Sequence, residues 1–119
     1  MEISDGVVQK TLGILEGFAR EKKLINYGEL YPQIGLDRED PADRHIGAVI
    51  LGEVNKITIK ERGVMISSLV TLREEQYPAD GFFEFAVELG RMTPIKDEEK
   101  LLAFWAGEVK ETFKSYDEK

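Results

Sequence analysis

Two helix start signals lie close together in the first half of the chain. Asn26 followed by Glu29 is a capping box, in which each side chain can bond to the other residue's backbone amide. Asp40 and Pro41 place a cap before a proline at the first helical position, and Asp43 lies in the first turn. Two successive helices with a short connection are therefore predicted. The apolar face of the second comprises Ile46, Val49, Ile50 and Val54.

Two glycines interrupt this second helix. Gly47 and Gly52 each cost about 1 kcal/mol of helix propensity relative to alanine. A glycine inside a helix also allows a neighbouring element to approach the helix backbone closely.

A run rich in β-branched residues follows the second helix. Residues 57–59 read Ile-Thr-Ile, and residues 60–63 form a polar stretch that ends in a glycine suited to left-handed backbone. Residues 64–72 are again apolar and β-branched. The pattern predicts a β-hairpin over residues 57–72.

Three further amphipathic segments predict helices. One spans Asp5–Lys22 and has Ser4 as its cap, and a second spans about Gly81–Leu89. The third begins at Thr93-Pro94 and has a stripe of large apolar residues. That stripe comprises Leu102, Trp105, Val109, Phe113 and Tyr116.

The order of these elements indicates the fold class. Three helices, a two-stranded hairpin and two C-terminal helices predict an α+β, mainly helical, winged-helix-like fold, in which the hairpin is the wing. The 119 residues suit a single domain spanning residues 1–119. No basic, apolar leader and no run of roughly 18 apolar residues is present, so a cytoplasmic protein without a membrane partner is expected.

The composition excludes several kinds of chemistry. The chain has no cysteine, which rules out disulfides, thiolate metal sites and cysteine nucleophiles. His45 is the only histidine, and no glycine-rich phosphate loop is present. No metal, cofactor or catalytic constellation is indicated, and an enzyme is the least favoured class.

The net charge of −7 is unevenly distributed. Residues 1–24 are neutral, residues 25–73 carry −1, and residues 74–119 carry −6. Nucleic-acid binding draws most of its affinity from basic surfaces, so the acidic excess disfavours it for the C-terminal part. The nearly neutral middle segment weakens that objection.

Residues 25–70 resemble the DNA-binding part of alkylguanine-DNA alkyltransferases and alkyltransferase-like proteins. Tyr27-Gly28-Glu29-Leu30 is similar to the segment that opens that family's second helix, and Ala42–Gly47 is similar to the segment that opens its recognition helix. The resemblance implies a winged-helix fold and places Arg44 where the family's arginine enters the base stack beside a flipped nucleotide. Residues 67–91 also resemble a pattern that recurs in small prokaryotic proteins, without indicating an activity.

The chain departs from the family at the reactive strand. Ser67 stands where the family has its alkyl-accepting cysteine, and Ser68 stands where it has the activating histidine. A serine without an adjacent base is a poor nucleophile, so alkyl transfer by the family's mechanism is excluded.

The candidate contacts with double-stranded DNA are all basic or polar. Arg44 and His45 lie near the start of the second of the two central helices, and Lys56, Lys60, Arg62 and Arg73 flank the predicted hairpin. Arg44 and His45 would contact bases, and the four residues beside the hairpin would contact phosphates. The alternatives are a solvated face, with Arg44 paired to Asp40 or Asp43, and a hairpin edge kept soluble by charge.

Two functions are therefore left open. The first is a non-catalytic binding module that contacts DNA through the helix containing Arg44 and through the hairpin. The alternative is an acidic protein-interaction or inhibitor module that works through the C-terminal helices, where its charge would steer it to a basic partner.

Overall fold

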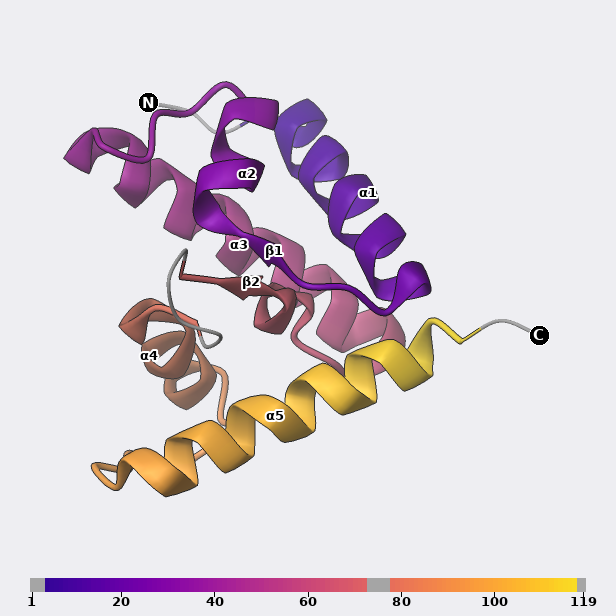
Figure 1. Cartoon of the computed structure of the whole chain (residues 1–119), viewed down its shortest axis with the longest axis vertical. Helices are drawn as coiled ribbons and strands as arrows, with labels where there is room; N and C mark the ends of the chain where they lie inside the picture. The colour runs from indigo at the N-terminus through magenta and orange to yellow at the C-terminus, as the bar shows by residue number, and fades with distance from the viewer. Residues whose placement is uncertain (1–3, 73–77, 118–119) are drawn as a thin grey trace.

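The chain forms α-helices connected by short, partly extended segments (Figure 1). The computed structural model describes residues 4–72 and 78–117. In chain order, the elements are α1 (Asp5–Glu21), β1 (Ile25–Asn26), α2 (Tyr27–Gln33), α3 (Pro41–Arg62), the 3₁₀ helix η1 (Ile66–Leu69), β2 (Val70–Thr71), α4 (Asp80–Glu88) and α5 (Glu98–Ser115). The fold is thus α+β and mainly helical, as predicted.

The predicted starts of the first three helices are confirmed. Ser4 Oγ accepts a hydrogen bond from the Val7 amide at 3.2 Å and caps α1. The capping box of α2 is formed, with a distance of 2.9 Å between the Glu29 amide and Asn26 Oδ1. Asp40 Oδ1 accepts from the Ala42 amide at the start of α3. Local side-chain chemistry sets where each of these helices begins.

The start of α5 differs from the prediction. The helix begins after Asp97 and not at Thr93-Pro94. Asp97 Oδ1 accepts from the amides of Glu99 and Lys100, and two glutamates occupy the first turn, where the helix dipole favours anions. These interactions favour a later start than the proline suggested.

The predicted β-hairpin is wrong. Residues 57–62 continue α3, which ends only at Gly63, where φ is 73° and the amide bonds to the Ile59 carbonyl. Thr58 is fully buried and lies on the same helical face as Leu51 and Val54. Burial at helical spacing therefore outweighs the β preference of the branched residues. No wing is formed by residues 57–72.

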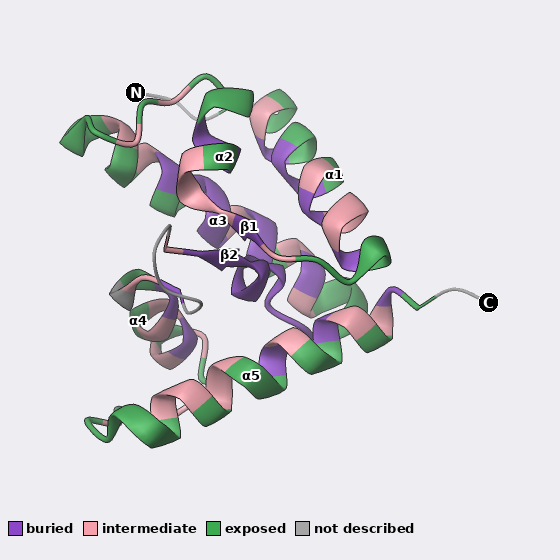
Figure 2. Cartoon of the chain, in the orientation of Figure 1, coloured by how far each residue is buried: buried purple, intermediate pink, exposed green. Residues whose placement is uncertain are grey.

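The second half of the predicted hairpin forms a different structure. Residues 66–69 are the 3₁₀ helix η1, and every one of them is buried (Figure 2). Only Val70 and Thr71 are extended, and they pair in parallel with Ile25 and Asn26. This two-stranded sheet therefore joins the start of α2 to the segment that follows η1.

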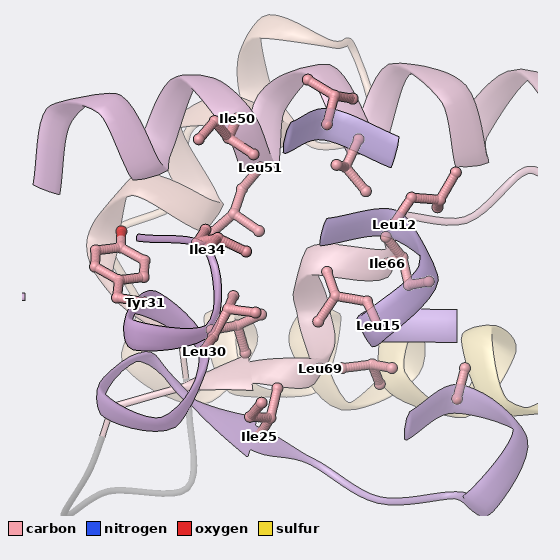
Figure 3. Close-up of a cluster of buried hydrophobic side chains, with 14 of the residues drawn as sticks. Leu12, Leu15, Ile25, Leu30, Tyr31, Ile34, Ile50, Leu51, Ile66 and Leu69 are labelled. Carbon is pink, nitrogen blue, oxygen red and sulfur yellow. The ribbon is translucent and has the colours of Figure 1, made fainter. Parts of the chain in front are cut away.

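The main core lies between α1, α2, α3 and η1 (Figure 3). Leu15, Leu30, Ile66 and Leu69 are completely inaccessible to solvent. The apolar stripe predicted for α3 is only partly confirmed, because Val49 is 38% exposed. Val49 therefore lies on the outer face of α3 and not in the core.

The two glycines of α3 are sites of close packing. A β-carbon at Gly47 would lie 2.3 Å from the hydroxyl oxygen of Tyr31, and one at Gly52 would lie 2.7 Å from the ring of Phe85. Tyr31 belongs to α2 and Phe85 to α4. Each glycine therefore allows an aromatic ring to rest directly on the α3 backbone.

A second, smaller cluster lies beneath α4. Its fully buried apolar members are Met65, Phe82 and Ala86. Phe104 and Trp105 of α5 pack against them but are only partly buried. The cluster attaches α4 to α5 and to the end of α3.

Candidate nucleic-acid interface

Three carboxylates where the preceding loop meets α3 bond to nearby backbone amides. Asp43 Oδ2 accepts from the Asp37 amide at 2.8 Å, and Asp37 Oδ1 accepts from the Glu39 amide at 2.9 Å. Asp40 is the helix cap. These bonds therefore hold the loop backbone in place where it enters α3.

Arg44 and His45 lie in the first two turns of α3, and both are exposed. The expected alternative, in which Arg44 pairs with Asp40 or Asp43, is not formed: among the described residues, Arg44 belongs to no ion pair. Its guanidinium is therefore available to a partner.

Lys56 and Lys60 belong to α3 instead of a wing. Both are exposed, and Lys56 lies 3.3 Å from Glu53 in an exposed ion pair one turn away. Such surface pairs contribute little to stability, typically below about 1 kcal/mol, and are easily exchanged for another anion.

Four exposed residues of α3 fall on one helical stripe. His45, Val49, Lys56 and Lys60 recur at intervals of three to four residues or multiples of them, opposite the buried face. We call these four residues, together with Arg44, which lies about 100° around the helix from His45, the α3 stripe. It presents three cations along a helix of 22 residues.

Arg62 has a structural role. Its Nη1 donates to the Ser115 carbonyl at 2.6 Å, and its guanidinium lies 3.8 Å from the centre of the Tyr116 ring. Tyr116 in turn donates to Glu16 of α1, and burial together with this carboxylate raises the pKa of the Tyr116 hydroxyl. Arg62 thus fastens the end of α5 and does not extend the α3 stripe. Arg73, the last predicted contact, lies outside the described residues.

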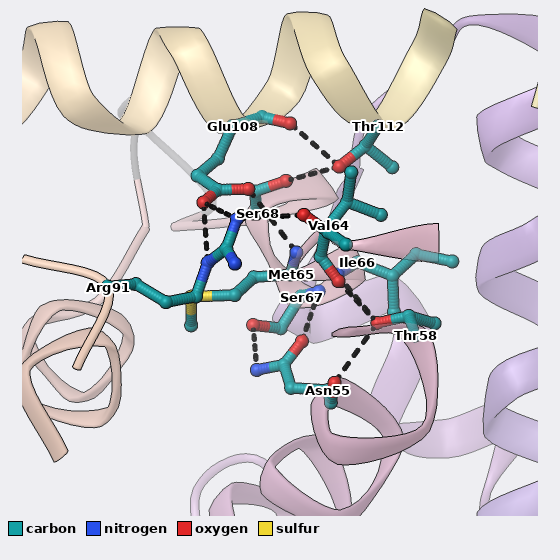
Figure 4. A network of polar contacts seen from close by, with 11 residues as sticks. Asn55, Thr58, Val64, Met65, Ile66, Ser67, Ser68, Arg91, Glu108 and Thr112 are labelled. Carbon is teal, nitrogen blue, oxygen red and sulfur yellow. Dashed lines mark hydrogen bonds and ion pairs between the residues drawn. The ribbon is translucent and has the colours of Figure 1, made fainter. Parts of the chain in front are cut away.

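The two serines are anchored in the interior (Figure 4). Asn55 donates to Ser67 Oγ at 2.7 Å and accepts from the Ser67 amide at 2.9 Å, and Ser68 Oγ lies 3.4 Å from Thr112 Oγ1. Both serines are buried, and these bonds satisfy them without an adjacent base. They lie on η1 and not on a strand, and η1 turns them toward α3 and α5.

An ion pair holds the segment after α4 against α5 (Figure 4). Arg91 Nη2 donates to Glu108 Oε1 at 2.6 Å and to the Gly63 carbonyl at 2.9 Å. The other carboxylate oxygen of Glu108 accepts from the Met65 amide. The sequence predicts no role for Asn55, Arg91 or Glu108. Asn55 could have been identified, because it directly follows Val54 on the buried face of α3.

The acidic excess of the C-terminal part does not give it a uniformly acidic surface. Glu108 is only 6% exposed and is paired with Arg91, whereas Lys110 and Lys114 are exposed on the same helix. The exposed acids include Glu84 and Glu88 on α4, and Glu98 at the start of α5. The two ends of α5 therefore differ in charge.

Searches against family models, curated proteins and solved structures each returned no match to this chain. Within residues 4–72 and 78–117, no helix has both the length and the apolar character to cross a membrane. The same residues contain no group of three or more metal-ligating side chains.

Proposed function

We propose that this chain is a non-catalytic DNA-binding module that contacts the duplex through the α3 stripe. The observation that carries the proposal is the exposed outer face of α3, with Arg44 unpaired among the described residues and Lys56 and Lys60 further along. A single α-helix fits the major groove of B-DNA. Residues near the N-terminus of such a helix reach base edges, and the cations contact phosphates.

The arrangement of α2 and α3 supports this mode of binding. The short α2 packs its Tyr31 on Gly47 of α3, which holds the two helices together, while His45, Val49, Lys56 and Lys60 on the other side of α3 stay exposed on either side of the α4 contact at Gly52. The order Tyr27-Gly28-Glu29, Arg44 and then the serine segment also matches the resemblance to the alkyltransferase-like proteins. We carry over DNA contact from that resemblance, but no alkyl transfer, because Ser67 is engaged by Asn55.

The acids before α3 are the main objection. The carboxylates of Asp37, Asp40 and Asp43 bond to backbone amides of the loop and of the first turn of α3, which satisfies part of their hydrogen-bonding capacity and directs them toward the chain. Their charge still lowers affinity, so moderate binding with strong salt dependence is expected.

Fluorescence anisotropy of a labelled duplex tests the proposal. The affinity should fall linearly with salt on a logarithmic scale. Lys56→Ala and Lys60→Ala should each reduce that slope by about one, because each removes one phosphate contact. Arg44→Ala should weaken binding by about 1–3 kcal/mol, provided that it contacts a base. Lys10→Ala, which removes an exposed cation from α1, is the matched control and should change nothing.

Two results would overturn the proposal. One is an absence of binding at high protein concentration in low salt. The other is binding that Lys10→Ala weakens as much as Lys60→Ala does, since this would reflect nonspecific attraction without use of α3.

A further inference from the structure

A shallow groove separates the end of α3 from the outer side of α5. Gly63 and Val64 form one wall, and the α5 residues from Ala103 to Ser115 form the other. Gly107 leaves the floor open, because a β-carbon at this position would meet no atom within 4 Å. The groove therefore exposes backbone and a small apolar surface between longer side chains.

The groove is basic although the chain is acidic. Its lining contains four cations, Arg62, Arg91, Lys110 and Lys114, against two acids, Glu108 and Glu111. Arg91 and Glu108 neutralise each other. Lys110 and Lys114 belong to no ion pair within the described part of the chain, and the Arg62 bond to the neutral Ser115 carbonyl leaves its charge uncompensated.

We propose that this groove binds an extended acidic segment of another protein. Lys110 and Lys114 are one helical turn apart, which corresponds to a rise of about 6 Å. Alternate residues of an extended peptide project to the same side at intervals of about 6.6 Å. Two carboxylates in such a peptide would therefore match the two lysines, and Arg62 would contact the peptide from the opposite wall.

The lining favours a peptide over a DNA backbone. Ala103 and Phe104 give the groove an apolar component, which small side chains between the carboxylates can contact. A guanidinium has five N–H donors, so Arg62 can hold a carboxylate while it remains bonded to Ser115. The site is separate from the α3 stripe, so it does not depend on the proposed function.

The probe is a short fluorescein-labelled peptide in which glutamate and alanine alternate, and the reference is its glutamine counterpart. The full chain should bind the first and not the second in low salt. Lys110→Glu combined with Lys114→Glu should weaken binding by about tenfold or more, the factor that a loss of about 1.4 kcal/mol produces. The same double variant should bind duplex DNA like the unmodified chain.

Gly107→Leu separates groove binding from simple charge attraction. The new side chain fills the groove floor, and stability should not fall, because the site is open and leucine favours a helix more than glycine does. The peptide should therefore bind this variant at least about tenfold more weakly. Ala106→Leu adds similar bulk at an exposed position outside the groove lining and should leave binding unchanged.

Three results would overturn the inference. They are equal binding of the glutamate and glutamine peptides, undiminished binding by Gly107→Leu, and no binding by the unmodified chain in low salt.

Discussion

The two sides of the molecule are held together by different interactions. Among the described residues, fifteen buried apolar residues form the core around α1, α2, α3 and η1, whereas three form the cluster beneath α4. The α4 side relies in addition on polar links, namely the Arg91–Glu108 pair and the bond from Trp105 to the Ser68 carbonyl. A region with few buried apolar residues opens at a lower free energy than the main core. We therefore expect α4 to open before α1–α3.

The strongest test of this difference compares the same substitution in the two regions. Leu15→Ala, in the main core, should lower the free energy of unfolding by about 3 kcal/mol, because the residue is fully buried and leaves a cavity. Leu89→Ala, beside the smaller cluster, should cost only about 1 kcal/mol, because the side chain is partly solvated. Urea titration followed by circular dichroism measures both. Equal costs would show that the two regions are equally tightly packed.

Glycine-to-alanine substitutions test how closely α2 and α4 pack against the backbone of α3. Gly47→Ala should destabilise the chain by about 2 kcal/mol, because the new methyl group overlaps the buried ring of Tyr31. Gly13→Ala, on the open face of α1, should instead stabilise it by about 0.5–1 kcal/mol through helix propensity.

Gly52→Ala extends this series to the weaker region. Its methyl group meets Phe85, which is only partly buried, so α4 can shift and the cost should be smaller than at Gly47. Thermal unfolding of the three variants gives the order. A stabilising effect of alanine at position 47 would contradict the packing of α2 on α3.

The sequence was most informative where a signal is local. Ser4, Asn26 and Asp40 each satisfy free amides of the helix that follows, so their predicted starts are confirmed. The end of α3 could not be predicted in this way. Ile57 and Ile59 favour strands in isolation, whereas the burial of Thr58 and its bonds to the segment after Gly63 depend on the tertiary fold and favour the longer helix.

For the candidate site, the exposure of the charged residues could be predicted from the sequence, but their tertiary contacts could not. Arg44, His45, Lys56 and Lys60 are exposed, as expected of charged side chains, but Lys56 and Lys60 lie on α3 and not beside a hairpin. The contact of Arg62 with the Tyr116 ring could not be predicted. The two residues lie more than fifty positions apart, and only the tertiary fold brings them together. The parallel pairing of β1 with β2 escaped prediction for the same reason.

The ion pair near α4 should contribute less than the core does. Glu108→Gln removes the charge that holds Arg91 and should cost about 1 kcal/mol, because Arg91 is partly solvated and keeps its bond to the Gly63 carbonyl. The loss should appear as faster amide hydrogen exchange in α4, with α1 unchanged. Glu111→Gln, an exposed acid on the same helix, is the control. Equal acceleration of exchange in α1 would mean that the two regions unfold as one unit.

The smallest effect concerns Tyr27, which lies at the start of α2 and packs edge-on against Tyr31. Burial raises the pKa of the Tyr27 hydroxyl to about 12, and the Ala79 backbone, just before α4, opposes this shift. Above about pH 10 an unfolded tyrosine loses its proton first, so the unfolded state binds fewer protons and stability falls until the folded group also ionises. Tyr27→Phe should therefore flatten the loss of stability between about pH 10 and 12, by no more than about 1.4 kcal/mol per pH unit. Urea titrations of both proteins across this range measure the difference. Parallel pH profiles would mean that the Tyr27 hydroxyl is solvated and is not in contact with the Ala79 backbone.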